Sequence, residues 1–297
     1  MQKKIIAVLL SFLLIFSLVS CGKTEEDKRT AVVCLEYFSY DWARNIIGDD
    51  DSINLILLNR TGKDMHSFEP SVKDLAVISG ADLVVCLGGI SEEWLIEFAE
   101  KNGVELFMLM DAFLESDISS GYELDPEDID EHIFLSTEIP VAVIPELEEA
   151  LTGVMPEKGD IFRANSEKYC SMISELGEAD FKGKHVIVAD RYPFEYLSDD
   201  LGFTFAAAFD GCSSETEASF SIIVELAEEL KNSYVNTVFI LENSDKKLAE
   251  QIIFTSGRND VKIEELNSVQ SVSEKDIENG ITYYSLLKED IEKIGSL

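Results

Sequence analysis

Short apolar runs rich in β-branched residues alternate along the chain with longer stretches of helical spacing. Apolar runs without polar interruption are typical of strands buried on both faces, and apolar residues recurring every three or four positions indicate amphipathic helices. In the first half the predicted strands are Thr30–Leu35, Ile53–Leu58, Ala81–Leu87 and Glu105–Met110. The predicted helices between them are Tyr37–Ile47, Val72–Ser79 and a helix that contains Trp94. This alternation predicts a mostly parallel sheet covered by helices.

The second half repeats the alternation. Its predicted strands are His185–Ala189, Phe203–Ala208, Thr237–Leu241 and Val261–Leu266. Its predicted helices are Phe194–Leu201, Phe220–Leu230, Asp245–Ser256 and roughly Ile281–Ile294. Two similar α/β halves predict two lobes that enclose a cleft, because ligands of such sheets bind outside the carboxyl ends of the strands.

A helical stretch separates the two halves. After Ile144-Pro145, a short helix is expected over Glu146–Leu151, and Pro156 suits the first turn of a long helix that ends near Leu176. We therefore predict an N-terminal α/β lobe over residues 31–150, a connecting helix within 151–180, and a C-terminal α/β lobe over 181–297. No glycine-rich phosphate loop, GxSxG or HExxH motif occurs in the sequence.

The first residues have the pattern of an export signal. Lys3 and Lys4 precede the apolar stretch Ile5–Leu18, which is too short to span a membrane comfortably. The following Leu18-Val19-Ser20-Cys21-Gly22 resembles the lipobox of bacterial lipoproteins, in which the cysteine becomes the lipid-modified first residue. We expect a signal peptide over residues 1–20, a lipid anchor on Cys21 and a flexible tether over 21–30, which would hold the protein outside the cytoplasm at the bacterial membrane. An ordinary secretory leader with a coincidental cysteine is the alternative.

The charge balance narrows the possible partners. The chain carries 58 acidic and 24 basic residues, a formal net charge of -34. This argues against nucleic acid and anionic lipid headgroups, which both require a basic surface. Cations are the natural counter-charge, although most of these acids also suit an ordinary solvated surface.

The cysteines after Cys21 show no metal-cluster or redox spacing. No CxxC pair occurs among Cys34, Cys86, Cys170 and Cys212. Cys34 and Cys86 lie in apolar runs, where a cysteine usually acts as a small buried hydrophobic residue. Disulfide pairing in an exported protein stays open, and Cys212 lies in the segment most expected to be exposed.

Two of the three histidines lie beside carboxylates. His66 occurs in Asp64-Met65-His66-Ser67-Phe68-Glu69-Pro70, and His132 in Asp130-Glu131-His132-Ile133-Phe134-Leu135-Ser136. Neutral imidazole is a good ligand for zinc and similar divalent ions, so the pair predicts a shared metal site. Glu69 and Asp130 are candidates to orient the rings by hydrogen bonding. His185 begins an apolar run after a lysine, so a structural role is expected.

These stretches, in this order and spacing, resemble a known family over essentially the whole mature chain: the metal-binding lipoproteins of bacterial zinc and manganese ABC importers, or ZnuA-like solute-binding proteins. The matching stretches are His66–Pro70, Ala81–Leu83, Gly88-Gly89, Glu93–Leu95, Asp130–Leu135, Phe194–Leu197 and Phe239–Glu242. The resemblance implies two α/β lobes joined by a long rigid helix, with His66 and His132 as metal ligands in the cleft between them.

The second half departs from the pattern of the family. The resemblance places the third ligand, a histidine or glutamate, at Arg191 and the fourth, an aspartate, at Asn267. A guanidinium stays protonated and cannot coordinate a cation, and a neutral amide oxygen is a weak zinc ligand. Glu242 or Asp190 could complete the site, or water could. Alternatively the protein has lost metal binding and Arg191 pairs with an anionic group.

The resemblance implies a solute-binding lipoprotein that captures zinc or manganese and delivers it to an ABC permease. We expect a monomer with no enzymatic activity, because capture and release require no bond chemistry. The alternative is a surface adhesin or interaction module with a degenerate metal site. A metallohydrolase with Glu242 as its base is a third, weaker possibility.

Overall fold

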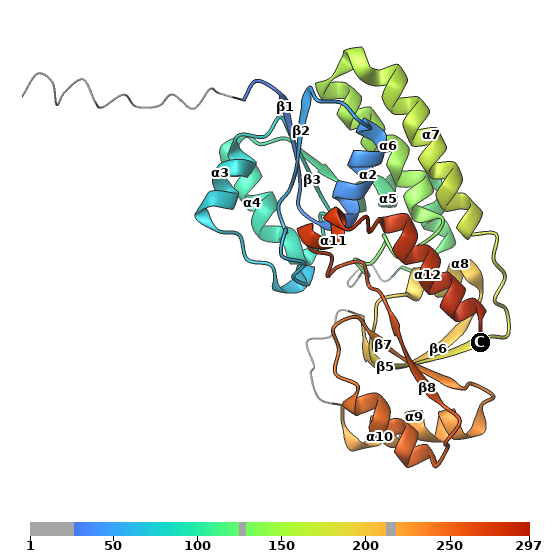
Figure 1. Ribbon diagram of the computed structural model, residues 1–297. Helices are drawn as coiled ribbons and strands as arrows, with labels where there is room; N and C mark the ends of the chain where they lie inside the picture. Colours follow the sequence, from blue (N-terminus) through green and yellow to red (C-terminus); the bar gives the residue numbers. More distant parts are fainter. Residues whose placement is uncertain (1–26, 125–128, 212–217) are drawn as a thin grey trace, which may run out of the picture.

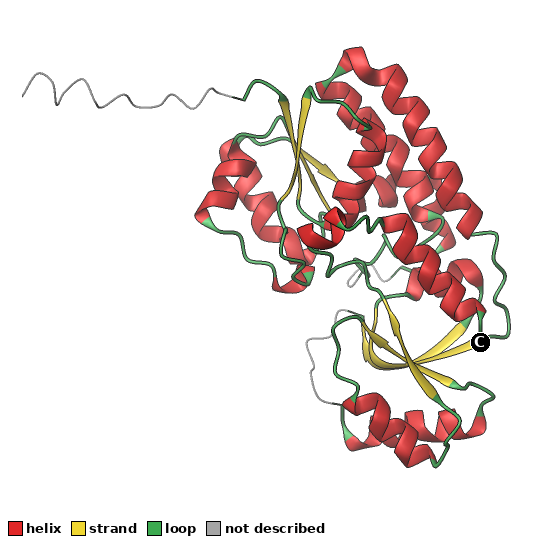
Figure 2. Ribbon diagram, viewed as in Figure 1, coloured by secondary structure: helices red, strands yellow, loops and turns green. Residues whose placement is uncertain are grey.

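The computed structural model describes residues 27–124, 129–211 and 218–297. Within these residues the chain forms two four-stranded sheets, each with helices on both faces (Figures 1 and 2). Every strand pairing is parallel. The predicted two-lobe α/β fold is therefore confirmed.

The N-terminal sheet has the strand order β2-β1-β3-β4. Its strands are β1 (Thr30–Cys34), β2 (Ile53–Leu57), β3 (Leu83–Cys86) and β4 (Leu106–Met108). Its helices are α2 (Tyr37–Ile47), α3 (Val72–Ser79), α4 (Glu93–Asn102), α5 (Leu109–Glu115) and α6 (Ile139–Val154), with 3-10 turns η1 (Met65–Ser67), η2 (Ile90–Glu92) and η3 (Asp117–Gly121).

The C-terminal sheet has the equivalent order β6-β5-β7-β8. Its strands are β5 (His185–Tyr192), β6 (Thr204–Asp210), β7 (Thr237–Leu241) and β8 (Lys262–Leu266). The remaining helices are η4 (Pro156–Lys158), α7 (Gly159–Leu176), α8 (Glu195–Leu201), α9 (Phe220–Asn232), α10 (Lys247–Ser256), α11 (Glu274–Glu278) and α12 (Tyr283–Gly295). In each sheet the strand order reverses between two central strands, β1 and β3 or β5 and β7, and ligands of such folds bind beyond the carboxyl ends of those strands.

Alternate residues of the central strands enter different cores. In β1, Val32 and Cys34 belong to a central core that extends through both lobes, whereas Val33 packs with α3 and α4 on the outer face. In β5, Val188 joins the same central core and Ile187 packs under α9 and α10. Burial on both faces explains the uninterrupted apolar runs in the sequence.

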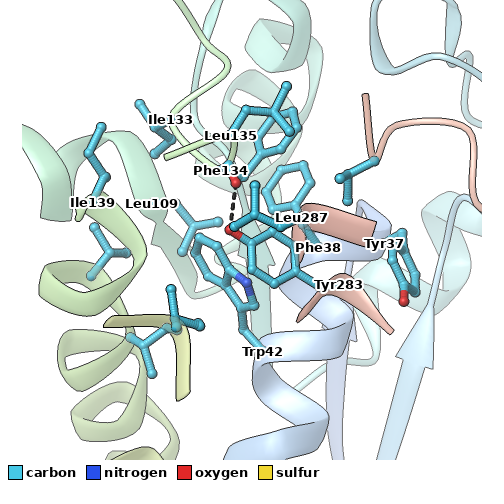
Figure 3. Packing of buried hydrophobic residues seen from close by; sticks show 14 of the residues in the cluster. Tyr37, Phe38, Trp42, Leu109, Ile133, Phe134, Leu135, Ile139, Tyr283 and Leu287 are labelled. Carbon is cyan, nitrogen blue, oxygen red and sulfur yellow. Dashed lines mark hydrogen bonds between the residues drawn. The ribbon is translucent and has the colours of Figure 1, made fainter. Parts of the chain in front are cut away.

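The C-terminal helix α12 closes the central core between the lobes (Figure 1). The Tyr283 hydroxyl donates to the backbone oxygen of Phe134 at 2.6 Å, beside the stacked rings of Phe38 and Phe134 (Figure 3). The Tyr283 backbone N–H donates to the buried carboxylate of Asp41, which also accepts from Tyr169 of α7. These bonds attach the end of the chain to the N-terminal lobe and to the long helix α7.

Two helices differ from the sequence-based expectation. The helix expected over Glu146–Leu151 begins at Ile139, because the apolar side chains on both sides of Pro145 share one buried face. The Cys170 thiol lies 3.9 Å from the Val141 oxygen, the carbonyl that Pro145 cannot pair with. The long helix α7 starts at Gly159, and Pro156 opens the separate turn η4.

The other two differences concern strand ends. The strand expected to reach Met110 ends at Met108, because Leu109, Met110 and Phe113 turn a buried face inward as helix α5. Strand β5 continues past Ala189 to Tyr192, so that Asp190 and Arg191 lie within it. Its pairing with β6 is irregular between Val188 and Arg191.

The described cysteines, Cys34, Cys86 and Cys170, are buried free thiols, while Cys21 and Cys212 lie outside the described residues. Among the described helices, none is both long and apolar enough to cross a membrane. The leader, which was predicted from residues 1–20, also lies outside the described residues.

Asp200 of α8 connects the C-terminal lobe to the start of α6. Its Oδ2 accepts hydrogen bonds from the Ser136 hydroxyl and from the Thr137 backbone N–H, at 2.8 and 2.6 Å. Its Oδ1 accepts from the Tyr122 hydroxyl at 2.7 Å. A carboxylate at a helix N-terminus satisfies backbone N–H groups that have no partner within the helix.

We predict that Asp200→Ala destabilises the protein by on the order of 2 kcal/mol, because several partly buried donors lose their acceptor. Denaturant unfolding measures the change. The neighbouring Asp199 is exposed, so Asp199→Ala is the matched control and should change stability by less than about 0.5 kcal/mol. Equal effects of the two substitutions would contradict the prediction.

Candidate metal centre

The loop after β2 presents His66 on a short 3-10 turn. Asp64 caps this turn, because its Oδ1 accepts from the His66 backbone N–H at 3.0 Å. Met65 is buried in the central core and anchors the turn to the lobe. The His66 side chain is 25% exposed. A solute can therefore reach the ring from the cleft, while its backbone is held in place.

His132 is completely buried just before α6. Oδ1 of Asp130 lies 2.9 Å from its backbone nitrogen and 2.5 Å from its ring Nδ1. A ring that donates from Nδ1 keeps its lone pair on Nε2, so Asp130 sets the tautomer that a metal ligand requires. The structure thus gives Asp130 the contact expected from the sequence.

The two histidines meet at the carboxyl edge of the N-terminal sheet. Their ring centroids are 5.6 Å apart and their planes are inclined by 62°. Nitrogens about 2.0 to 2.1 Å from a shared tetrahedral zinc ion would bring two imidazole rings to about this spacing. The two rings predicted to act together are therefore neighbours in space.

Among the described carboxylates, Glu131 alone is paired with the His66 ring, and the sequence reasoning did not select it. Its Oε2 lies 3.8 Å from His66 Nδ1, and its Oε1 accepts from the Ser91 backbone N–H at 3.0 Å. Glu69, the residue expected to orient His66, is exposed. The signal was present in the Asp130-Glu131-His132 run, in which two carboxylates directly precede the histidine.

Two further buried carboxyl groups lie at this edge. Glu36 follows β1 and accepts from the Asn59 side chain, and Glu92 accepts from the Gly88 backbone N–H. Burial raises the pKa of Glu92 to about 7, and the neighbouring Glu131 raises this pKa further. Burial also raises the pKa of Glu36 well above its usual value. Neither residue was predicted, because in the sequence each looks like an ordinary helix-flanking acid.

Arg191 pairs with the opposite lobe. Its Nη2 donates to Asp64 Oδ2 at 2.9 Å, on the same residue that caps the turn of His66. The pair is partly exposed, and ion pairs of this kind contribute about 0.2–1 kcal/mol. The guanidinium thus crosses the cleft to the His66 loop.

The C-terminal oxygens considered as ligands all have protein partners. Asp190 accepts from the backbone N–H groups of Arg191 and Leu241. Both oxygens of Glu242 accept from Ser268, and Oδ1 of Asn267 accepts from the Val269 backbone N–H.

The C-terminal lobe nevertheless reaches His132. The Tyr196 hydroxyl donates to the Asp130 backbone oxygen at 2.9 Å, and a Cβ added to Gly211 would lie 3.3 Å from the His132 ring. Within residues 27–124, 129–211 and 218–297, no three His, Cys, Asp or Glu side chains are already grouped closely enough to hold an ion.

Comparison with known proteins gives the family. The family model described as "ZnuA: Zinc-uptake complex component A periplasmic" matches residues 32–296. The chain belongs to the ZnuA family. It is 26% identical over 309 residues to the zinc-binding lipoprotein AdcA of Streptococcus pneumoniae, an alignment that covers 99% of this chain and 60% of AdcA. It therefore spans less than two thirds of the length of that relative.

Two further comparisons cover their relatives more completely. The high-affinity zinc uptake system protein ZnuA of Bacillus subtilis is 22% identical over 279 residues, which cover 89% of this chain and 86% of that protein. The Zn(II)-bound ZnuA-like domain of Streptococcus pneumoniae AdcA has a TM-score of 0.72 at 24% identity, over 90% of this chain and 97% of that domain. This structural likeness supports the shared two-lobe fold.

We predict that Glu92→Gln stabilises this ZnuA-family protein, without metal, by up to about 3 kcal/mol at pH 7.5. Because the pKa of Glu92 is raised to about 7 in the folded state, the unfolded carboxyl ionises first. The stability of the unaltered protein therefore falls as pH rises from about 4.5 to 7. Denaturant unfolding between pH 4 and pH 8 measures this effect.

The gain in stability from Glu92→Gln should vanish near pH 4, where the Glu92 carboxyl is protonated in both the folded and the unfolded state. Glu93 is an exposed neighbour, so Glu93→Gln serves as the control and should show no such pH dependence. A gain for Glu92→Gln that is the same at both ends of the pH range would rule out ionisation as its cause.

Proposed function

We propose that this protein captures a divalent transition metal outside the cytoplasm and delivers it to an ABC import permease. The observation that carries the proposal is the closeness of the His66 and His132 rings, whose centroids are 5.6 Å apart. Two imidazoles suit zinc and other borderline divalent ions. The zinc-binding relatives favour zinc as the cargo, and manganese is the second candidate.

We propose that the ion is held mainly by the N-terminal lobe, with water completing its coordination. The hydrogen bonds of Glu242, Asp190 and Asn267 support this over direct coordination by the C-terminal lobe. An open position would weaken the site and ease handover, since a permease would have fewer protein ligands to displace. Arg191 then holds the lobes together at the cleft through Asp64.

The membrane attachment and the absence of catalysis are parts of the same proposal. A lipid anchor on Cys21 would keep the protein beside its permease, and the zinc-binding lipoprotein AdcA offers a parallel. We propose that the protein acts as a monomer and performs no bond chemistry. Glu242 would be a poor hydrolytic base, because both its oxygens accept from Ser268.

An adhesin or interaction module with a degenerate site remains the alternative function. This alternative predicts that the fold does not depend on metal binding. It also predicts that partner binding is insensitive to the loss of either histidine. Metal affinity separates the two functions directly.

We predict that His66→Ala and His132→Ala each weaken zinc binding by more than roughly 100-fold, beyond the 10–100-fold typical of residues that only orient a ligand. Isothermal titration calorimetry of the purified protein with zinc and with manganese measures the affinity.

His185→Gln provides the control. The ring of His185 bonds to Thr204 and lies 3.0 Å from a carboxylate oxygen of Glu229. His185 begins β5, at the end of the strand that is opposite to Asp190 and Arg191. Its loss should leave metal affinity unchanged. If unaltered protein and both site variants bind zinc and manganese equally poorly, metal capture is not the function.

A further inference from the structure

We propose that Glu131 is itself a ligand of the captured ion. The N-terminal lobe would then supply two imidazoles and one carboxylate, in place of a ligand from the C-terminal lobe. This inference rests on the proposed function, because it concerns the same ion between His66 and His132.

The first support is distance. Glu131 Oε2 lies 3.8 Å from His66 Nδ1, which is too long for a hydrogen bond. Oxygen and nitrogen ligands about 2.0 to 2.2 Å from one tetrahedral zinc ion lie roughly 3.4 Å from each other. A movement of about half an ångström would place an ion between the two atoms. The described side chains are not yet grouped as a metal site, so coordination must draw them together by such a movement.

The second support is the way in which the carboxylate is held. One oxygen, Oε1, accepts from the Ser91 backbone N–H, and the side chain rests on Gly89. A Cβ added to Gly89 would lie only 2.2 Å from Oε1 and 2.5 Å from Cδ. Glycine at this position therefore creates the space that Glu131 fills. The second oxygen is directed by these contacts rather than left to rotate freely.

The third support is that a buried carboxylate oxygen of Glu131 accepts no hydrogen bond from the described residues. Glu131 is only 4% exposed, and its Oε2 accepts no hydrogen bond from any described residue. Burying a carboxylate oxygen without a partner is costly. Among the ion pairs of the described residues, Glu131 is paired with the His66 ring alone. Arg191, which crosses to the His66 loop, is paired with Asp64. A divalent cation beside Oε2 would offset this cost.

This ligand set would select the kind of metal ion that is bound. Two imidazoles and one carboxylate suit a divalent ion of borderline hardness, and the remaining position would be filled by water. Ligands from one lobe allow the ion to bind before the lobes close, so closure through Arg191 and Tyr196 would not itself be needed for coordination.

The decisive experiment compares metal binding by the full protein and by Glu131→Gln. Glutamine keeps the size of the side chain and an oxygen for the Ser91 N–H, but it removes the negative charge. Zinc affinity is measured by calorimetry, and Co(II), as a visible-light probe of coordination, is titrated into the same samples. We expect zinc affinity to fall by more than roughly 100-fold and the Co(II) spectrum to change.

Glu69→Gln is the matched control, because it removes an exposed carboxylate three positions from His66. It should leave both the affinity and the spectrum unchanged. An unchanged affinity in Glu131→Gln would overturn the inference. So would a weaker affinity with an unaltered Co(II) spectrum, since Glu131 would then only orient His66.

A measurement on the unaltered protein keeps the test valid if Glu131→Gln fails to fold. In a zinc-bound crystal structure, Glu131 Oε2 should lie within about 2.2 Å of the ion, and a separation beyond about 3 Å would refute direct coordination. Failure of the unaltered protein to bind zinc or manganese at all would instead refute the proposed function.

Discussion

The placement of the buried His132 ring depends on an interaction with its own chain neighbour. Asp130 holds both the backbone and the ring of His132, and Tyr196 of the other lobe holds the backbone of Asp130. Phe134, two residues further on, stacks on Phe38 and accepts from Tyr283. The ring that we propose as a metal ligand thereby forms part of the seam between the lobes.

Charge is distributed unevenly across this seam. The N-terminal edge concentrates buried carboxylates, two of which have raised pKa values because burial disfavours their ionised forms. On the C-terminal edge, the carboxylates and the amide are occupied by backbone N–H groups and by Ser268. The only charge that crosses directly to the His66 loop, among the described ion pairs, is the guanidinium of Arg191. The family resemblance implied a ligand at that position, whereas here Arg191 forms a contact between lobes.

Local patterns were sufficient for most of the fold. The β-branched runs marked every strand to within a few residues, and helix α2 was predicted at its observed bounds, because burial on two faces and helical amphipathicity both leave periodic signals. The exceptions arose where tertiary burial outweighed a local rule. Helix α6 continues through Pro145, and the apolar residues after Met108 form α5 rather than a longer strand.

By itself, the sequence determined the two-lobe α/β architecture, the family, and the two histidines that lie together at the cleft. Only the tertiary structure decided which side chains surround them. Glu131 faces His66, Glu69 faces solvent, and the oxygens of Glu242 and Asn267 bond to neighbouring residues. The physical reason is that periodicity reports the burial of an element, whereas a carboxylate is directed by partners far away in the chain. For Glu131 those partners are Gly89 and Ser91, some forty residues earlier.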